Sequence, residues 1–563
     1  MLNVQRALPG ILAAVIGCTG SIGGAGPSSS AGPTIDRRPR EPAPITTPGA
    51  PIPEGGTVEM VTCDRDARPS NPSRLWRLNP EQLSATYARV FGTELALRGH
   101  PFEAIGEGDS GSTFTNLVEI STMHEEAVRR LTAAVQDVVG PAADRALLDE
   151  ACLADAPSEG CLRRHLEPLV ARATRKADNG RQVDRLVQRA MAENDEGGDG
   201  LLLAYALLAL SPEVLFRWEL ANDGASLSSE AYAEFLAFTL TDEPPGAELA
   251  ERLRAGADPR EEARALLSSD AGRDVLHRFM REYFDYDASD GDSKDDAVHS
   301  MEALIESTRV WVDALIDGPN FFQRLLLSTE VYANRDSAYA YGVMASGDEH
   351  ERFDLGPDQR SGILTQPSFL ANLATFDHTD PTKRGHFILN HFLCDEVGGI
   401  PADVPPLPDD PTLTMRERLD LHRSRADCAA CHSRMDPLGF PLEQFDHLGR
   451  WRDEEKGRPV DTSGEFFGGT DIDGRFETPR DLAEALASSA QAGTCFVNHA
   501  FQFVYGRMPA QSSAGDVIGA DACVIADVYE AWSTSEGSLV DLFVELMVSE
   551  AAHTRIPASG EER

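Results

Sequence analysis

The sequence predicts a mostly α-helical chain that folds into several small helical domains. At 563 residues it exceeds what one hydrophobic core usually organises, and 41% of its residues are apolar, enough to fill several cores. Apolar side chains recur with the spacing of a helix face through much of the chain. Alternating, strand-like runs are few and short.

The segment over residues 232–240 shows this spacing most clearly. Tyr232, Phe235, Leu236 and Leu240 fall at i, i+3, i+4 and i+8, which places them on one helical face. Similar spacing predicts helices over residues 125–139, 300–316, 495–504 and 536–551. Gly506 supplies a C-terminal stop for the fourth of these helices.

The first residues indicate export. Arg6 precedes a short apolar stretch, Ile11 to Ile16, which is too short to span a bilayer and is typical of a signal peptide. The stretch ends in Val-Ile-Gly-Cys18, which resembles the lipobox of bacterial lipoproteins, so we expect cleavage to leave Cys18 as the lipid-bearing first residue. The alternative is an ordinary signal peptide cut near Gly20 or Gly24. The sequence thus predicts an exported lipoprotein anchored to a membrane, at its periplasmic or cell-surface face.

The charge of the chain argues against nucleic-acid binding. Fifty-one basic and 92 acidic residues give a net charge of −41, spread along the whole sequence. Such a field repels phosphate backbones and anionic lipid headgroups. It favours cationic partners, or simply keeps an exported protein in solution.

Six cysteines remain for disulfides once Cys18, Cys428 and Cys431 are set aside, and six allow fifteen pairings. Short loops favour the pairs Cys152–Cys161 and Cys495–Cys523, which leaves Cys63 with Cys394. An oxidising compartment would preserve such bridges. Free, buried cysteines are the alternative.

Residues 428–432 read Cys-Ala-Ala-Cys-His and carry the clearest chemistry. Covalent haem attachment needs two thiols one helical turn apart and a histidine beside the second thiol, and this motif supplies all three groups. We therefore expect one haem c bound by Cys428 and Cys431, with His432 as the proximal iron ligand. A structural zinc site would need two further ligands, and no second Cys-x-x-Cys exists. A thioredoxin-type dithiol would follow a strand, whereas residues 416–425 look helical.

The flanks of the motif resemble a known family. From Thr414 the chain reads MRERLDLHRSRADCAACHSRMDPLGFPLEQFDHLGRWRDEEKGRPVDTSGEF, which is similar to the cytochrome-like domain of large secreted planctomycete and myxobacterial proteins (the PSCyt/PSD group). The start of that domain resembles residues 360–394. Neighbouring domains of the family resemble Trp76–Gly92, Ser211–Leu220 and Cys495–Arg507. This family has no known enzymatic activity, so the resemblance implies architecture more than function.

The second axial ligand is less clear than the first. His422, at a position that the family shares, is the leading distal candidate. Met435 belongs to the proximal helix and is expected to line the pocket wall. His499 is expected to be a partly exposed helix histidine with its hydrogen bonds made, and His378, His391 and Met508 are weaker candidates.

Residues after the motif are expected to shape the haem pocket. Pro437 should stop the haem-binding helix, and Gly439 should let the backbone pass close to another group, such as the porphyrin. Arg450, Trp451 and Arg452 are candidates for holding a haem propionate. A surface ion-pair cluster around a buried indole is the alternative.

Composition and resemblance together predict the organisation of the chain. The expected parts are a lipoprotein signal peptide (1–18), a flexible Gly/Pro/Ser linker (19–57), helical domains at 58–145, 146–207 and 208–345, a cytochrome c-like haem-binding domain (357–464) and a C-terminal helical domain (470–551).

Two functions of different classes fit these features. The first is electron transfer, by the protein alone or as the electron-transfer module of an extracytoplasmic oxidoreductase with a redox partner protein. The second is a cell-surface binding or scaffold protein with a structural haem. Direct haem catalysis would need an open distal position. Motifs of serine hydrolases, zinc proteases and P-loop enzymes are absent, so whether the chain is an enzyme is left open.

Overall fold

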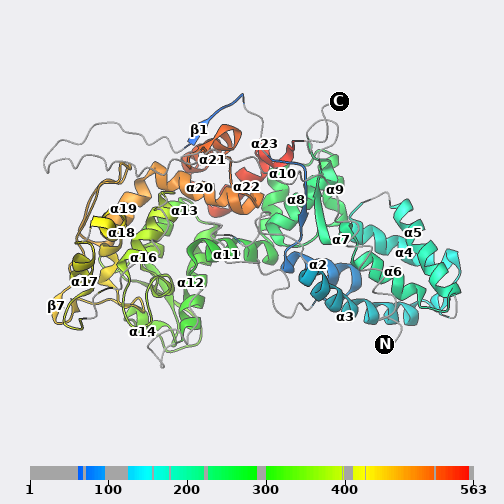
Figure 1. Cartoon of the computed structure of the whole chain (residues 1–563), viewed down its shortest axis with the longest axis horizontal. Coiled ribbons are helices and arrows are strands. Elements are labelled where there is room, and N and C mark those ends of the chain that lie inside the picture. The colour runs from blue at the N-terminus through cyan, green and yellow to red at the C-terminus, as the bar shows by residue number, and fades with distance from the viewer. Residues whose placement is uncertain are drawn as a thin grey trace. The chain divides into compact units, whose positions relative to one another are not determined.

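The computed structural model describes residues 61–66, 71–95, 114, 125–154, 157–176, 179–220, 226–287, 300–395, 397, 407, 410–424, 426–512 and 515–556. The predicted signal peptide, the predicted linker and Cys18 lie outside these residues. Helices dominate the described part, and strands occur there as short pairs, which confirms the mostly α prediction (Figure 1). Two compact units are present, one built around residues 135–214 and the other from residues 58–134 and 215–557. The domain boundaries proposed above stay predictions.

The first unit is a small helical bundle. Its helices are α4 (Glu159–Thr174), α5 (Gly180–Asp195) and α6 (Gly200–Ala209), preceded by the 3-10 turn η2 (Ala151–Leu153) and by the second half of α3 (Glu125–Asp149). Ser158 caps α4 through its side chain and Asp199 caps α6. The predicted Cys152–Cys161 disulfide joins η2 to α4.

The second unit contains an antiparallel strand pair that includes the buried carboxylate of Glu219. Strands β2 (Arg74–Arg77) and β3 (Phe216–Glu219) pair antiparallel, with Arg74 opposite Glu219. Helix α2 (Pro80–Phe91) follows β2 through a capping box formed by Asn79 and Gln82. The short helix α7 (Pro212–Leu215) leads into β3.

A helical layer follows in sequence. Its members are α8 (Ser229–Thr241), α9 (Ala247–Arg254), α10 (Pro259–Leu267), α11 (Asp270–Phe284), α12 (Met301–Ile316) and α13 (Phe321–Leu327). The helices predicted over residues 232–240 and 300–316 are thereby confirmed. Strands β4 (Glu330–Ala333) and β5 (Glu351–Asp354) flank the short helix α14 (Ala338–Tyr341).

The segment with the Cys-x-x-Cys-His motif is built from short helices and hairpins. In chain order these are η4 (Gly362–Thr365), α15 (Pro367–Asn372), α16 (Pro381–Phe387), the π-helical turn η5 (Ile388–Phe392), α17 (Met415–His422), α18 (Ala426–Gly439), η6 (Phe440–Gln444), β6 (Glu454–Glu455), β7 (Arg458–Pro459), β8 (Gly464–Phe466) and β9 (Gly474–Phe476). In Figure 1, helices α16, α17 and α18 lie close to one another.

The C-terminal helices complete the second unit. They are α19 (Pro479–Ser488), α20 (Ala490–Tyr505), α21 (Gly519–Thr534), α22 (Leu539–Val548) and α23 (Glu550–His553). Helix α20 ends at Gly506, as predicted, in a left-handed conformation (φ 57°). One hydrophobic core runs from α8 and α11 through α18 to α20 and α22, so the motif helix rests on the same core as the C-terminal helices.

Two of the predicted disulfide pairs are wrong. Cys495 bonds to Cys394, and Cys523 bonds to Cys63, because the fold overrides sequence proximity. Strand β1 (Val61–Cys63) pairs in parallel with β10 (Val517–Ile518), directly before α21, which brings Cys63 to Cys523. Helix α20 packs against η5, which brings Cys495 to Cys394.

None of the described helices combines the length and the apolar character that crossing a bilayer requires.

Candidate functional site

Helix α18 presents the two motif thiols on one side of a single helix. Cys428 and Cys431 are three residues apart, about one helical turn, and both are half-buried thiols outside any disulfide. Cys431 packs against the main hydrophobic core. Two unpaired thiols with this spacing, one at the edge of an apolar surface, fit the thioether attachment of a haem.

A buried carboxylate contacts Nδ1 of the His432 imidazole. Its Nδ1 lies 3.0 Å from Oδ1 and 3.2 Å from Oδ2 of Asp436, one turn further along α18. The Asp436 side chain is completely buried, and its Oδ1 also accepts a 2.8 Å hydrogen bond from the hydroxyl of Thr382 on α16. A carboxylate at Nδ1 fixes the tautomer that leaves Nε2 with its lone pair for a metal ion. The donor set on α18 therefore fits a haem iron.

His422 lies beside His432. It is the last residue of α17, it is buried, and its ring centroid is 4.9 Å from that of His432 at an interplanar angle of 62°. The structure thus brings the two predicted ligands together.

Helix α17 is attached by a small apolar cluster of its own. Met415 and Leu419 pack on Phe440, apart from the main core. Arg416 lies over the Phe440 ring at 3.7 Å from its centroid. A helix held by so few buried side chains can shift more easily than one embedded in the main core.

Helices α16 and α18 approach each other closely at two glycines. A Cβ added at Gly385 would lie 1.8 Å from the Met435 carbonyl oxygen, and one added at Gly439 would lie 1.8 Å from the Pro381 carbonyl oxygen. The close approach predicted for Gly439 is therefore made to the backbone of α16. The prediction that Pro437 ends the helix is wrong, because α18 continues through it to Gly439.

A buried ion pair fixes the chain after α18. Arg384, on α16, is fully buried and donates to Glu443 Oε1 at 3.2 Å and to the Leu442 carbonyl at 2.7 Å. Arg452 and Thr379 donate to the other carboxylate oxygen of Glu443, at 2.9 and 2.6 Å. Burial raises the pKa of Glu443, although Arg384 and Arg452 oppose that rise. The sequence analysis did not identify Arg384 as a structural residue, because no sequence pattern indicates that a single arginine is buried.

The candidate propionate ligands already have partners. Arg450 bonds to Asp446 at 2.7 Å, and Arg452 bonds to Glu443. This matches the ion-pair alternative, except that Trp451 is 37% exposed and not a buried indole.

The zinc alternative receives no support from the described residues. There, the motif residues do not gather with further ligands as a zinc site would require. A group of three ligand-bearing side chains lies elsewhere, at Cys394, Cys495 and His499. His499 was expected to be partly exposed with its hydrogen bonds made, but it is 8% exposed and neither ring nitrogen has a hydrogen-bond partner.

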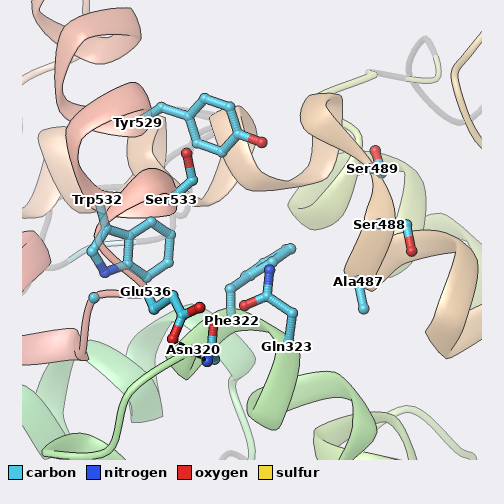
Figure 2. Close-up of a pocket in the computed structure, with 11 residues that line it drawn as sticks. Asn320, Phe322, Gln323, Ala487, Ser488, Ser489, Tyr529, Trp532, Ser533 and Glu536 are labelled. Atoms are coloured by element: carbon cyan, nitrogen blue, oxygen red, sulfur yellow. Dashed lines mark hydrogen bonds between the residues drawn. The ribbon is translucent and has the colours of Figure 1, made fainter.

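A separate cleft of about 330 Å³ lies between α13, α21 and the α19–α20 junction. Figure 2 shows Tyr529, Trp532 and Ser533 of α21 above Asn320 and Gln323. Asn320 and Glu536 line this cleft and both have a left-handed backbone, with φ of 53°. The Asn320 side chain donates to Glu536 Oε2 at 3.2 Å. No motif in the sequence pointed to this cleft.

The structure shows a mostly helical protein with a Cys-x-x-Cys-His motif on α18, and two segments of the chain match known family models. Residues 360–455 match the family model PSCyt3, described as "Protein of unknown function (DUF1588)". Residues 227–343 match PSD4, described as "Protein of unknown function (DUF1592)". These segments belong to the planctomycete cytochrome C (PSCyt/PSD) domain group that the sequence resembles. No curated protein and no solved structure matches the chain.

Proposed function

We propose that α18 carries one covalently bound haem c and that the protein transfers electrons. The observation that supports this most directly is the His432–Asp436 contact on the helix that presents Cys428 and Cys431. The cytochrome-like class of the matched family agrees with it. The same protein could act alone or as the electron-transfer module of an extracytoplasmic oxidoreductase.

The residues of the site have distinct roles in this proposal. A haem bound there supplies a one-electron iron couple. Cys428 and Cys431 attach it through thioethers, and His432 offers Nε2 to the iron. Asp436 orients the imidazole and raises its basicity, which favours the ferric state. The Thr382 hydroxyl fixes the rotamer of Asp436, and thereby couples α16 to the position of His432.

A binding protein with a structural haem is the second candidate, and the cleft in Figure 2 favours it. That cleft has a volume in the range of small-molecule sites and mixes aromatic with amide and hydroxyl groups. Reversible reduction of the haem by a mild reductant supports electron transfer, whereas a haem inert to such reductants supports the structural role.

The proposal includes a cellular location. We propose that the chain is exported and anchored through lipid on Cys18, where it meets a redox partner protein, and that the acidic surface favours a partner with a cationic docking face. Cys18→Ser should then release the protein from the membrane fraction. Unchanged fractionation of this variant would contradict the anchor.

The haem assignment has a direct test. The double variant Cys428→Ala/Cys431→Ala should lose covalent haem when it is exported with the c-type maturation machinery, because neither thioether can form. Haem staining of a denaturing gel measures the loss. The matched control is Cys152→Ala/Cys161→Ala, which removes a disulfide from the first unit and should keep the stain. Equal staining of both variants would overturn the assignment.

A further inference from the structure

The Cys394–Cys495 disulfide lies against a buried histidine. Cys394 follows the π-helical turn η5, and Cys495 and His499 stand one turn apart on α20. One ligand atom from each of these three residues lies within 4.8 Å of the other two. Two sulfurs and an imidazole nitrogen at this spacing are three quarters of a tetrahedral site for a thiophilic metal ion.

The imidazoles in this cluster have unused nitrogens. Both ring nitrogens of His499 and Nδ1 of His391 are buried without a hydrogen-bond partner. The two rings stack at 6° with their centroids 5.6 Å apart. An imidazole nitrogen that is buried without a partner can bind a metal ion without giving up a hydrogen bond.

The surroundings of the cluster are rich in acceptors and poor in donors. The side-chain oxygens of Asn390, Gln491 and Asn498, all on η5 or α20, are also buried without a partner. The amide nitrogens of Gln491 and Asn498 are already directed at the Leu393 carbonyl and at Cys394 Sγ. Buried acceptors left without donors are costly, and a cation compensates them better than a neutral group does.

We propose that reduction of the Cys394–Cys495 disulfide creates a binding site for one thiophilic divalent metal ion of the zinc type. Cys394, Cys495 and His499 would be its ligands, and a water molecule would take the fourth position. An external dithiol or phosphine supplies two electrons, and two protons complete the thiols. The metal ion then displaces these two protons as it binds both sulfurs. The sulfurs must separate to about 3.8 Å, given zinc–sulfur bonds of about 2.3 Å.

Cys394 is placed to allow this separation and to admit a reductant. It is half-buried, whereas Cys495 is fully buried, so a reductant meets Cys394 Sγ first. It also lies two residues after the end of η5 and has a left-handed backbone (φ 48°), a conformation that non-glycine residues rarely adopt. A residue outside regular structure can move its side chain without disturbing α20.

Zinc titration of the reduced full-length protein tests the proposal. The background is Cys428→Ala/Cys431→Ala, so that the motif thiols contribute nothing and the result is independent of the haem. A water-soluble phosphine reduces the disulfides, being oxidised to the phosphine oxide, and competition with a chromogenic chelator measures zinc affinity. His499→Phe should lower that affinity at least about tenfold. The matched control is His277→Phe, which removes a similarly buried histidine that pairs with Asp313 and is not part of the ligand group, and which should change nothing.

Cobalt provides a second measurement in the same Cys428→Ala/Cys431→Ala background. Co²⁺ added to the reduced form of this protein should give visible absorption typical of tetrahedral thiolate coordination, and its oxidised form should give none. The proposal is overturned if the reduced protein takes up no zinc, if His499→Phe and His277→Phe bind zinc equally, or if the helical circular dichroism is lost on reduction.

Discussion

His432 and Asp436 form a hydrogen-bonded pair on one face of α18, with Nδ1 of the imidazole 3.0 Å from a carboxylate that is completely buried. The four-residue spacing places both side chains on the same side of the helix. A partner at Nδ1 decides how basic Nε2 is, and so how strongly the ring favours ferric over ferrous iron. This pair therefore makes the redox behaviour of the proposed haem depend on a residue outside the motif.

Replacing Asp436 tests this dependence. Asp436→Asn keeps the size of the side chain but removes its charge, so Nε2 should become a weaker donor to ferric iron. The midpoint potential should rise by on the order of 60–120 mV, which corresponds to a ten- to hundredfold change for a one-electron couple. Spectroelectrochemical titration measures it. Asp453→Asn, which alters a surface partner of Trp451, is the control and should leave the potential unchanged. An unchanged or lower potential in Asp436→Asn would refute the role.

The neighbouring histidine leads to a prediction about spin state. If His422 closes the distal face, the oxidised protein is low-spin, and His422→Ala should convert it to high spin and allow rapid carbon monoxide binding after reduction. Absorption spectra of both redox states measure this change. His378→Ala removes a more exposed histidine that pairs with Asp377, and should leave the spectrum unchanged. A low-spin spectrum that persists in His422→Ala would exclude His422 as the ligand.

Sequence patterns predicted the local structure well because helices depend on nearby residues. The spacing of Tyr232, Phe235 and Leu240 identified α8, and Gly506 marked the end of α20. The motif likewise lies on a helix, as thiols one turn apart require. Pro437 misled the prediction because a proline inside a helix costs one backbone hydrogen bond without necessarily ending the helix, and α18 continues two residues beyond it.

Long-range relationships could not be read from the sequence in the same way. Loop length suggested that Cys495 bonds to Cys523, but the pairing of β1 with β10 decides the partner of Cys523. The burial of His499 depends on the rings of Phe114 and Tyr283, neither of which is near it in sequence. Asp436 is the exception, because its i+4 spacing from His432 was a usable signal.

The buried carboxylate of Glu219 should matter for stability. Its oxygens lie 2.8 Å from Arg555, 3.0 Å from Arg74 and 3.1 Å from Arg217, and Glu219 itself is completely buried. Glu219→Gln removes the charge that compensates three buried guanidinium groups. The free energy of unfolding at pH 7 should fall by about 3–5 kcal/mol. Urea unfolding followed by circular dichroism measures this loss, and Glu248→Gln, at an exposed surface pair, is the control.

The same residue predicts a dependence on pH. Burial alone would raise the pKa of Glu219, but Arg74, Arg555 and Arg217 together lower it from 4.5 to about 2. The contribution of Glu219 to stability is therefore complete above pH 4.5 and is lost as the pH falls towards 2. The stability gap between wild type and Glu219→Gln should shrink by about 2 kcal/mol between pH 5 and pH 3. A gap that stays constant over this range would show that Glu219 does not titrate as described.

The glycine contact between α16 and α18 gives a prediction that separates packing from helix propensity. Alanine is the better helix former by about 0.5–1 kcal/mol, so Gly385→Ala should stabilise α16 if only local structure counted. Its Cβ, however, would lie 1.8 Å from the Met435 carbonyl oxygen and 2.6 Å from the carbonyl carbon. Backbone atoms cannot rotate away, so the two helices must separate, and the free energy of unfolding should fall by about 1–3 kcal/mol.

Separation of α16 from α18 should also change the proposed haem site. The bond from Thr382 to Asp436 joins the same two helices, so Gly385→Ala should loosen Asp436 and shift the midpoint potential in the same direction as Asp436→Asn, by a smaller amount. Gly140→Ala is the control, because that glycine lies inside α3 with nothing within 4 Å of an added Cβ. This control should be neutral or slightly stabilising, whereas a stabilised Gly385→Ala protein would mean that α16 and α18 do not pack as closely as the structure shows.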